Sequence, residues 1–259
     1  MKRQILLTTN NTKTIKGEKL GYKTYIMYLA PYTQNSKGIN LCSHASEGCA
    51  EACLFGSGMG GIYTHVENAR IKKTEYFLSS RIEFITQLKT EIETAIRLNK
   101  DKAIPVFRLN GTSDIPFEKF KIFDGKNLFE IFNNVQFYDY TKNHIRIQKE
   151  LPSNYNLTFS RSETNNEMAF KLLNKGFNVA MVFSKTPKQY KGYEVVDGDV
   201  DDLRFLDKKN VIVGLRYKKM TGLNSNNKLA FESGFAISTP KVLALPKYKK
   251  EKQILRRAA

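Results

Sequence analysis

The chain has 259 residues, of which 41% are hydrophobic and 12% aromatic, and its formal net charge is +17 at pH 7. This length and composition support one large α/β domain or two small ones, and they exclude a chain that is disordered throughout. No apolar run approaches the ~18 residues of a transmembrane helix, so a membrane partner is not expected.

Strands are predicted where short apolar or β-branched runs end in polar or glycine residues. The first run, KTYIMYLAP, is rich in Tyr, Ile and Met, and Pro31 would end it. The predicted strands are residues 23–31, 103–109, 135–140, 156–160, 178–183, 194–196, 211–215 and, less regular, 234–238.

Helices are predicted between these strands. Apolar residues recur every three to five positions from Thr64 to Asn99, with a break near Ser79 and Ser80. Further helices are expected at 117–133 with an interruption at Gly125, around 143–150, at 163–174 with Ser162 as N-cap, and at 201–206. The five Phe residues between 117 and 132 are assigned to the core, and Gly176 is placed just beyond a helix C-terminus.

Alternating strands and helices indicate a parallel sheet with right-handed crossovers. An open sheet and a barrel give the same pattern. Polar side chains follow the strand ends at Asp114, Lys142, Arg161, Asp197 and Arg216. On a barrel these loops share one mouth, whereas on an open sheet they meet only where the strand order reverses. The fold class predicted is therefore an α/β fold with a parallel (βα)6–7 partial or complete barrel.

Positive charge is concentrated at the two ends of the chain. Residues 1–24 contain six Lys or Arg and one acidic residue, and residues 240–259 contain seven and one. Basic ends attract nucleic acid or another polyanion, although they also serve solubility. We expect a basic segment at 1–22, a single domain at 23–239 and a basic tail at 240–259. The candidate polyanion contacts are Lys142, Arg216, Lys247, Lys249 and Lys250.

All three cysteines lie in one stretch, LCSHASEGCAEACLFGSGMGG, which spans residues 41–61 and is called the Cys loop here. Thiolates at Cys42, Cys49 and Cys53 suit zinc or an iron–sulfur cluster. A [4Fe–4S] cluster would use three thiolates and keep one iron open, whereas zinc would need His44 as a fourth ligand. Thiols that bind no metal are the alternative. Their odd number argues against disulfides and places the protein in a reducing cytoplasm.

Two other clusters could hold a ligand or serve the fold. Arg161 could bind a carboxylate or phosphate, or form an internal ion pair with Asp139 or Asp197. Four carboxylates between Asp197 and Asp202 could bind a cation such as Mg²⁺, but helix capping is favoured. The glycine run that ends the Cys loop lacks the Lys-Ser/Thr ending of a P-loop.

A first strand, then a three-cysteine loop, then a helix resembles the partial barrel of the radical S-adenosylmethionine enzymes. The resemblance implies a [4Fe–4S] cluster on the three cysteines and S-adenosylmethionine at its open iron. It places the loop after the second strand against the cofactor, where Gly111 would allow close approach and Asp114 would accept ammonium hydrogen bonds. A simple strand-to-helix turn is the alternative. The candidate cofactor-binding residues are Asn110, Gly111, Thr112, Ser113, Asp114, Arg161 and Glu163.

A closer resemblance covers about residues 25–220. The pieces MYLAPY, CLFGSG, RLNGTSD, VQFYDYTK, LTFSRSE and VVDGDVDDLRFLD are similar to a family of phage and mobile-element proteins, some labelled as replication proteins. This implies a location in the host cytoplasm. Two functions remain open. One is an Fe–S enzyme of the radical S-adenosylmethionine type acting on a nucleic-acid-linked or other polyanionic substrate. The alternative is a nucleic-acid-binding, replication-associated protein with a structural metal site.

Overall fold

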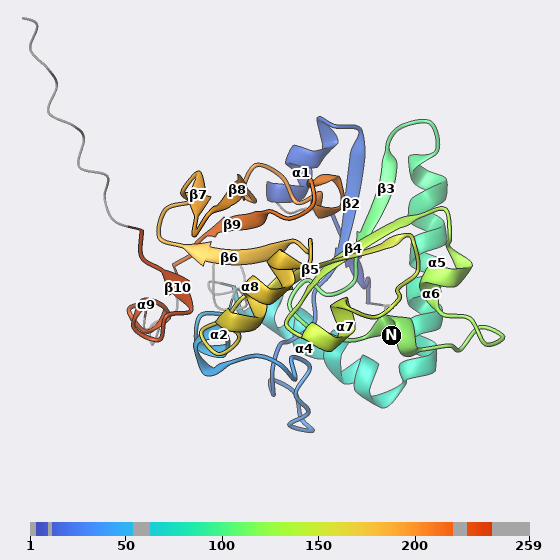
Figure 1. Ribbon diagram of the computed structural model, residues 1–259. Coiled ribbons are helices and arrows are strands. Elements are labelled where there is room, and N and C mark those ends of the chain that lie inside the picture. The colour runs from blue at the N-terminus through green and yellow to red at the C-terminus, as the bar shows by residue number, and fades with distance from the viewer. Residues whose placement is uncertain (1–3, 10–11, 54–62, 220–226, 240–259) are drawn as a thin grey trace, which may run out of the picture.

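One large sheet with helices packed around it forms the mixed α/β structure shown in Figure 1. This computed structural model describes residues 4–9, 12–53, 63–219 and 227–239. The glycine run of the Cys loop and the candidate residues Lys247, Lys249 and Lys250 lie outside the described residues.

The sheet is mostly parallel and its described strands follow the order β1-β2-β3-β4-β5-β6-β9-β8-β7, with β10 beside β6. Only β1 with β2 and β7 with β8 pair antiparallel among these strands. The path begins at β1 and ends at β7 without returning to its start. The strands are β1 (Leu7–Thr8), β2 (Tyr22–Met27), β3 (Ile104–Arg108), β4 (Gln136–Thr141), β5 (Tyr155–Ser160), β6 (Val179–Phe183), β7 (Gln189–Tyr190), β8 (Tyr193–Asp197), β9 (Ile212–Arg216) and β10 (Ala236–Ile237). The predicted parallel α/β architecture is confirmed.

The sheet divides at β6. One edge of β6 pairs with β9 along its whole length. The other edge pairs first with β5, at Val179 and Ala180, and then with β10, at Val182 and Phe183. β5 and β10 therefore share one edge of β6, and the chain before β10 enters next to the end of β5.

The described helices are α1 (Thr12–Glu18), α2 (Glu47–Glu51), α4 (Thr64–Ser79), α5 (Arg81–Asn99), α6 (Leu128–Ile131), α7 (His144–Ile147), α8 (Asn166–Asn174) and α9 (Leu229–Glu232), with 3-10 turns η2 (Phe117–Lys119) and η3 (Arg204–Leu206). The break predicted near Ser80 is confirmed, because Ser80 separates α4 from α5. None of the described helices is long and apolar enough to cross a membrane.

The segment predicted as a helix at 117–133 is interrupted at Gly125, as expected, but it is much less helical than predicted. The segment contains only η2 and α6, with a turn between them in which Asp124 and Gly125 have φ angles of 49° and 78°. Asn127 then starts α6 with a capping box that includes Glu130. The Phe residues nevertheless belong to the core: Phe117 and Phe129 are fully buried.

Two further boundaries differ from the prediction. Ser162 does not cap α8; its N–H donates to the Asn165 side chain, and the helix begins at Asn166. Residues 201–206, predicted as a short helix, contain the 3-10 turn η3. The strand predicted at 194–196 is confirmed as β8, whereas β1, α1, β7 and α9 were not predicted, because each is short.

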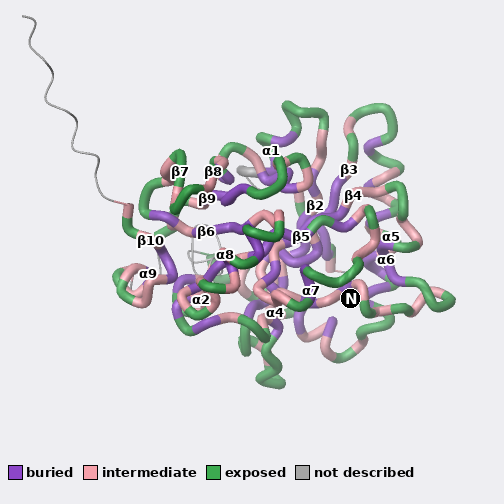
Figure 2. The backbone as a smooth tube through the Cα atoms, viewed as in Figure 1, coloured by how far each residue is buried: buried purple, intermediate pink, exposed green. Residues whose placement is uncertain are grey.

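The two faces of the sheet have different neighbours. Phe107 and Phe137 join the large core that includes residues of α4, α5 and α8. Val106 and Tyr138, one position away in each strand, pack with Leu203 on the opposite face. The tube in Figure 2 shows the central strands buried and much of the outer helical surface exposed.

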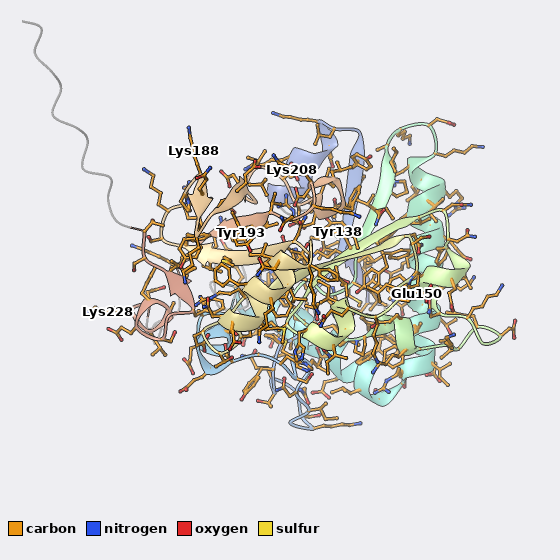
Figure 3. The ribbon with its side chains drawn as sticks, in the orientation of Figure 1. Tyr138, Glu150, Lys188, Tyr193, Lys208 and Lys228 are labelled. Carbon is orange, nitrogen blue, oxygen red and sulfur yellow. The ribbon has the colours of Figure 1, made fainter. Side chains whose placement is uncertain are left out.

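The second face carries buried polar groups. The Asp202 carboxylate accepts hydrogen bonds from Arg108 Nη1 at 3.1 Å and from the Tyr138 hydroxyl at 3.2 Å. Figure 3 shows Tyr138 near the middle of the sheet. The segment between β8 and η3 therefore covers this face and neutralises Arg108.

Candidate metal centre

The described part of the Cys loop lies across the carboxyl ends of several strands. The Cys42 thiol donates to the Thr112 carbonyl, after β3, at 3.6 Å. The Lys142 ammonium group, after β4, lies close enough to Cys49 for the thiol to favour its charge. Parallel strands place their carboxyl ends along one edge, which is where ligand sites of α/β folds form.

Cys42 interacts with both of the other cysteines. The pKa of its thiol is raised to about 12, mainly by burial; Cys53, Cys49 and Asp114 act in the same direction, and the backbone N–H of Tyr32 opposes them. These effects place Cys49 and Cys53 in the neighbourhood of Cys42. All three are free thiols and partly buried.

Two cations face this neighbourhood. Burial by itself lowers the pKa of Lys142, but Cys49, Asp114 and Cys42 outweigh it, so the net pKa is raised. Lys142 Nζ also donates to Ser160 Oγ at 2.9 Å. Arg70, on α4, is close enough to Cys53 for the thiol to favour its charge, and its guanidinium stacks on the Tyr28 ring at 5.0 Å. Cations beside thiols favour the thiolate, which is the form that binds metals.

Glu163 holds the short helix that carries Cys49. Its two carboxylate oxygens accept hydrogen bonds from Ser46 Oγ and from the Gly48 N–H, each at 2.8 Å. Ser46 is the N-cap of α2 and accepts from the Cys49 N–H at 3.3 Å. Glu163 thus contacts the Cys loop, and no cofactor group is needed to account for its position.

The loop after β3 is occupied by contacts within the protein. Asn110 donates to Asp139, and its side-chain oxygen accepts from Ser113 and Ile115. Thr112 donates its hydroxyl to the Leu29 carbonyl. A Cβ on Gly111 would lie 2.7 Å from the Met27 carbonyl oxygen and 2.6 Å from the Tyr28 ring, so this glycine permits a close approach to β2.

Asp114 is the hub of this loop. Its N–H donates to the Leu41 carbonyl in the Cys loop at 2.9 Å. Its carboxylate accepts from the Lys142 N–H at 2.9 Å and pairs with Arg146 Nη1 at 2.8 Å. The predicted acceptor of a cofactor ammonium group is thus already engaged in holding two loops together.

Arg161 and Arg216 occupy separate places. Arg161 Nη1 donates to the carbonyls of Gly234 and Phe235 at 2.6 and 2.9 Å, where the chain enters beside β5. These carbonyl contacts take the place of the ion pair considered with Asp139 or Asp197. The Arg216 side chain is exposed at the end of β9, and its N–H donates to Asp199.

The carboxylates between β8 and η3 diverge. Asp197 accepts from the Asp199 N–H, Asp199 pairs with Lys218, Asp201 accepts from the Leu203 N–H, and Asp202 pairs with Arg108. Each therefore has a partner, and their placement favours turn capping and ion pairing over a shared cation.

Among residues 4–9, 12–53, 63–219 and 227–239, no group of three or more His, Cys, Asp or Glu side chains is arranged to hold a metal ion. His44, the proposed fourth zinc ligand, is exposed and lies 3.0 Å from Ser43 Oγ through its Nδ1. The metal centre at Cys42, Cys49 and Cys53 therefore stays a prediction.

Sequence analysis missed several residues around the thiols. Arg70 lies within a long helix and carries no local signal. Ser46 was detectable, since a serine three residues before Cys49 at the start of a short helix is a typical N-cap. Lys142 was identified by its place after a strand, but its contact with Cys49 requires the folded chain.

The chain was compared with known protein families, curated proteins and solved structures. A family model described as Gene product 88 matches residues 4–237. The match agrees with the resemblance to phage proteins. No curated protein and no solved structure matches the chain.

Proposed function

The chain belongs to the Gene product 88 family, and we propose that Cys42, Cys49 and Cys53 bind one metal centre, a [4Fe–4S] cluster, in an enzyme of the radical S-adenosylmethionine type. The observation that carries the proposal is that three free thiols from one loop lie in one neighbourhood beside two cations. The free thiols are compatible with a reducing host cytoplasm.

The residues present fit a thiolate-bound group. Three thiolates close together repel one another, and the raised pKa of Cys42 reflects burial and this repulsion. Lys142 and Arg70 supply positive charge at Cys49 and Cys53, which lowers the cost of ionising the thiols. When bound, the cluster and S-adenosylmethionine would supply one-electron chemistry.

The chain's own residues would position and shield this centre. Glu163 and Asp114 fix the Cys loop over the strand ends. Phe235, Ala230 and Ala52 form an apolar cluster against which Cys49 packs, and this cluster limits access of water. We extend the proposal to the sheet, which we infer curves as a partial barrel, since Asp202 is held by Arg108 and Tyr138 across its inner face.

The proposed substrate is nucleic-acid-linked or otherwise polyanionic. The support is the net charge of +17 and the exposure of lysines such as Lys188 and Lys228, which lie at the outer edge of the molecule in Figure 3. The same charge supports a second candidate function, a nucleic-acid-binding replication protein in which a metal at the cysteines is structural.

Metal analysis of anaerobically purified protein tests the proposal. An iron–sulfur centre predicts iron and sulfide in stoichiometric amounts and a broad absorption near ~400 nm from thiolate-bound iron. Each of Cys42→Ser, Cys49→Ser and Cys53→Ser should remove the iron, and a double replacement should remove no more than a single one, because the ligands act as a unit. Stoichiometric zinc without iron would favour the second candidate, and protein free of both metals would contradict the metal centre.

A further inference from the structure

The loop after β5 holds two separate segments that meet at Cys49. Arg161 binds the carbonyls of Gly234 and Phe235, and Glu163 binds the start of α2. Residues 229–237, which comprise α9 and β10, are called the strap here. The strap packs on α2: Ala230 and Phe235 share an apolar cluster with Ala52 and Cys49.

Gly48 shows how closely the start of α2 packs against Glu163 and the strap. A Cβ at this position would lie 2.8 Å from Glu163 Oε1 and 2.6 Å from Ser233 Oγ. Ordinary Cβ contacts do not reach such distances, so a side chain at residue 48 would displace the Glu163 carboxylate, the Ser233 hydroxyl or the turn itself. The turn is therefore held between the carboxylate on one side and the strap on the other.

The backbone that carries Glu163 is held in place by its neighbours. Ser162, next to Glu163, is completely buried, and its N–H donates to the Asn165 side chain at 2.6 Å. The Arg161 N–H donates to the Ala180 carbonyl of β6 at 2.9 Å. Glu163 thus projects from backbone that is bonded to the sheet. Its hydrogen bonds with Ser46 and Gly48, together with the bond from the Cys49 N–H to Ser46, hold Cys49 in place.

We propose that Glu163 is a positioning residue: it sets the place of Cys49 relative to Lys142 and the other two thiols, and it does not bind a cofactor. Metal ligands need a supporting shell that fixes them to within about 0.5 Å. The importance of this role for activity rests on the proposed metal centre, but the positioning itself can be measured in metal-free protein.

The test compares site-specific alkylation by iodoacetamide, followed by peptide mass spectrometry, in reduced metal-free protein. Glu163→Ala should increase the alkylation rate of Cys49 by about tenfold. Loss of a charge-assisted hydrogen bond shifts the equilibrium between the detached and the bound form of the α2 turn by at least that factor. Cys42, which is held by the loop after β3, should change much less. Glu163→Gln keeps an oxygen for the Gly48 N–H and an amide that can donate to Ser46, so it should restore slow alkylation.

Two further variants make the test independent of folding defects. Gly48→Ala keeps Glu163 but weakens its contact with the turn, because the new Cβ would lie too close to the carboxylate, so it should also accelerate alkylation selectively at Cys49. Glu167→Ala is the matched control, because Glu167 is exposed and pairs only within its helix with Lys171. Selective acceleration at Cys49 with rescue by glutamine supports the proposal. Unchanged rates, or equal acceleration at all three cysteines, overturns it.

The same proteins separate this inference from the proposed function. After anaerobic reconstitution with iron and sulfide, Glu163→Ala and Gly48→Ala should bind less iron than the wild type, and Glu163→Gln should bind as much. If the wild type binds no iron, the proposed function fails while the alkylation pattern still decides the role of Glu163.

Discussion

Asp114 accepts the backbone N–H of Lys142 at 2.9 Å, and this bond joins the loop after β3 to the loop after β4 beside the cysteines. The same carboxylate pairs with Arg146, whose guanidinium also binds Glu118 in a two-point contact. The position of Lys142 against Cys49 therefore depends on an ionic network that lies largely out of solvent.

Replacing Asp114 by Ala should destabilise the protein by about 3 kcal/mol, because it removes one of the two carboxylates that pair with the buried Arg146 and frees the Lys142 N–H. Asp114→Asn keeps an oxygen for that N–H and should cost less. The free energy of unfolding in urea measures both. Asp124→Asn is the control: Asp124 is exposed in a left-handed turn that asparagine also adopts. Equal stability of Asp114→Ala and the control would contradict this network.

Gly111→Ala should destabilise the protein by about 1–3 kcal/mol, because the new Cβ would overlap the Met27 carbonyl and the Tyr28 ring. The neighbouring Thr112 would also move, and this would displace the carbonyl that Cys42 contacts. Gly17→Ala is a matched control on α1, where the nearest side-chain atom lies 3.4 Å away and alanine favours the helix. Thermal unfolding of both variants checks the prediction. It fails if Gly111→Ala has the same unfolding temperature as Gly17→Ala.

The stability of the protein should fall as pH rises from 4 to 6. Burial raises the pKa of Asp139 from 3.8 to about 6, against the opposing effects of Arg108, Asn110, Arg146 and Tyr155. The folded protein therefore binds this proton more tightly than the unfolded chain. The resulting stabilisation is complete below about pH 4 and is lost as pH passes through about 6, with a limit of about 3 kcal/mol.

Asp139→Asn should remove this contribution and flatten the pH dependence, measured by urea unfolding between pH 4 and 7. Burial also raises the pKa of Asp207 to about 6, so Asp207→Asn should remove a second contribution of the same sign. A full slope in the doubly substituted protein would show that neither carboxyl group is its source.

Removing residues 241–259 should weaken binding to polynucleotides and reduce its salt dependence. The deleted segment contains seven Lys or Arg and one acidic residue, so the slope of log affinity against log salt should decrease by up to about 6. Titration of a labelled duplex at several salt concentrations measures the slope. An unchanged slope would move the polyanion contact to the rest of the chain, and circular dichroism should report an intact fold.

The central strands could be predicted because their sequence contains the information locally. β3, β4, β6 and β9 are short apolar runs that end in polar residues, and the structure places each within two residues of the expected bounds. β1 could not be predicted, because its two residues are fixed by Met27 and by Glu91, whose carboxylate accepts the N–H groups of Leu6 and Leu7. Such long-range contacts leave no periodic signal.

The candidate site shows the same division. The cysteines and the loop from Asn110 to Asp114 stand out by residue type and by position after strands. The contacts of Glu163 and Arg161 could not be predicted, because the sequence does not distinguish a charged side chain that binds a ligand from one that binds a backbone segment. Only the folded chain brings Glu163 to Gly48 and Arg161 to Gly234.

The shared edge of β6 also has a consequence for biosynthesis. β10 is the last of the described strands to be synthesised, and it pairs with the part of the β6 edge that lies beyond β5. The Cys loop and Glu163 precede β10 in the sequence and are therefore synthesised earlier. Until β10 pairs with β6, Phe235 cannot pack against Cys49, so Cys49 is more open to solvent in the growing chain than in the finished fold.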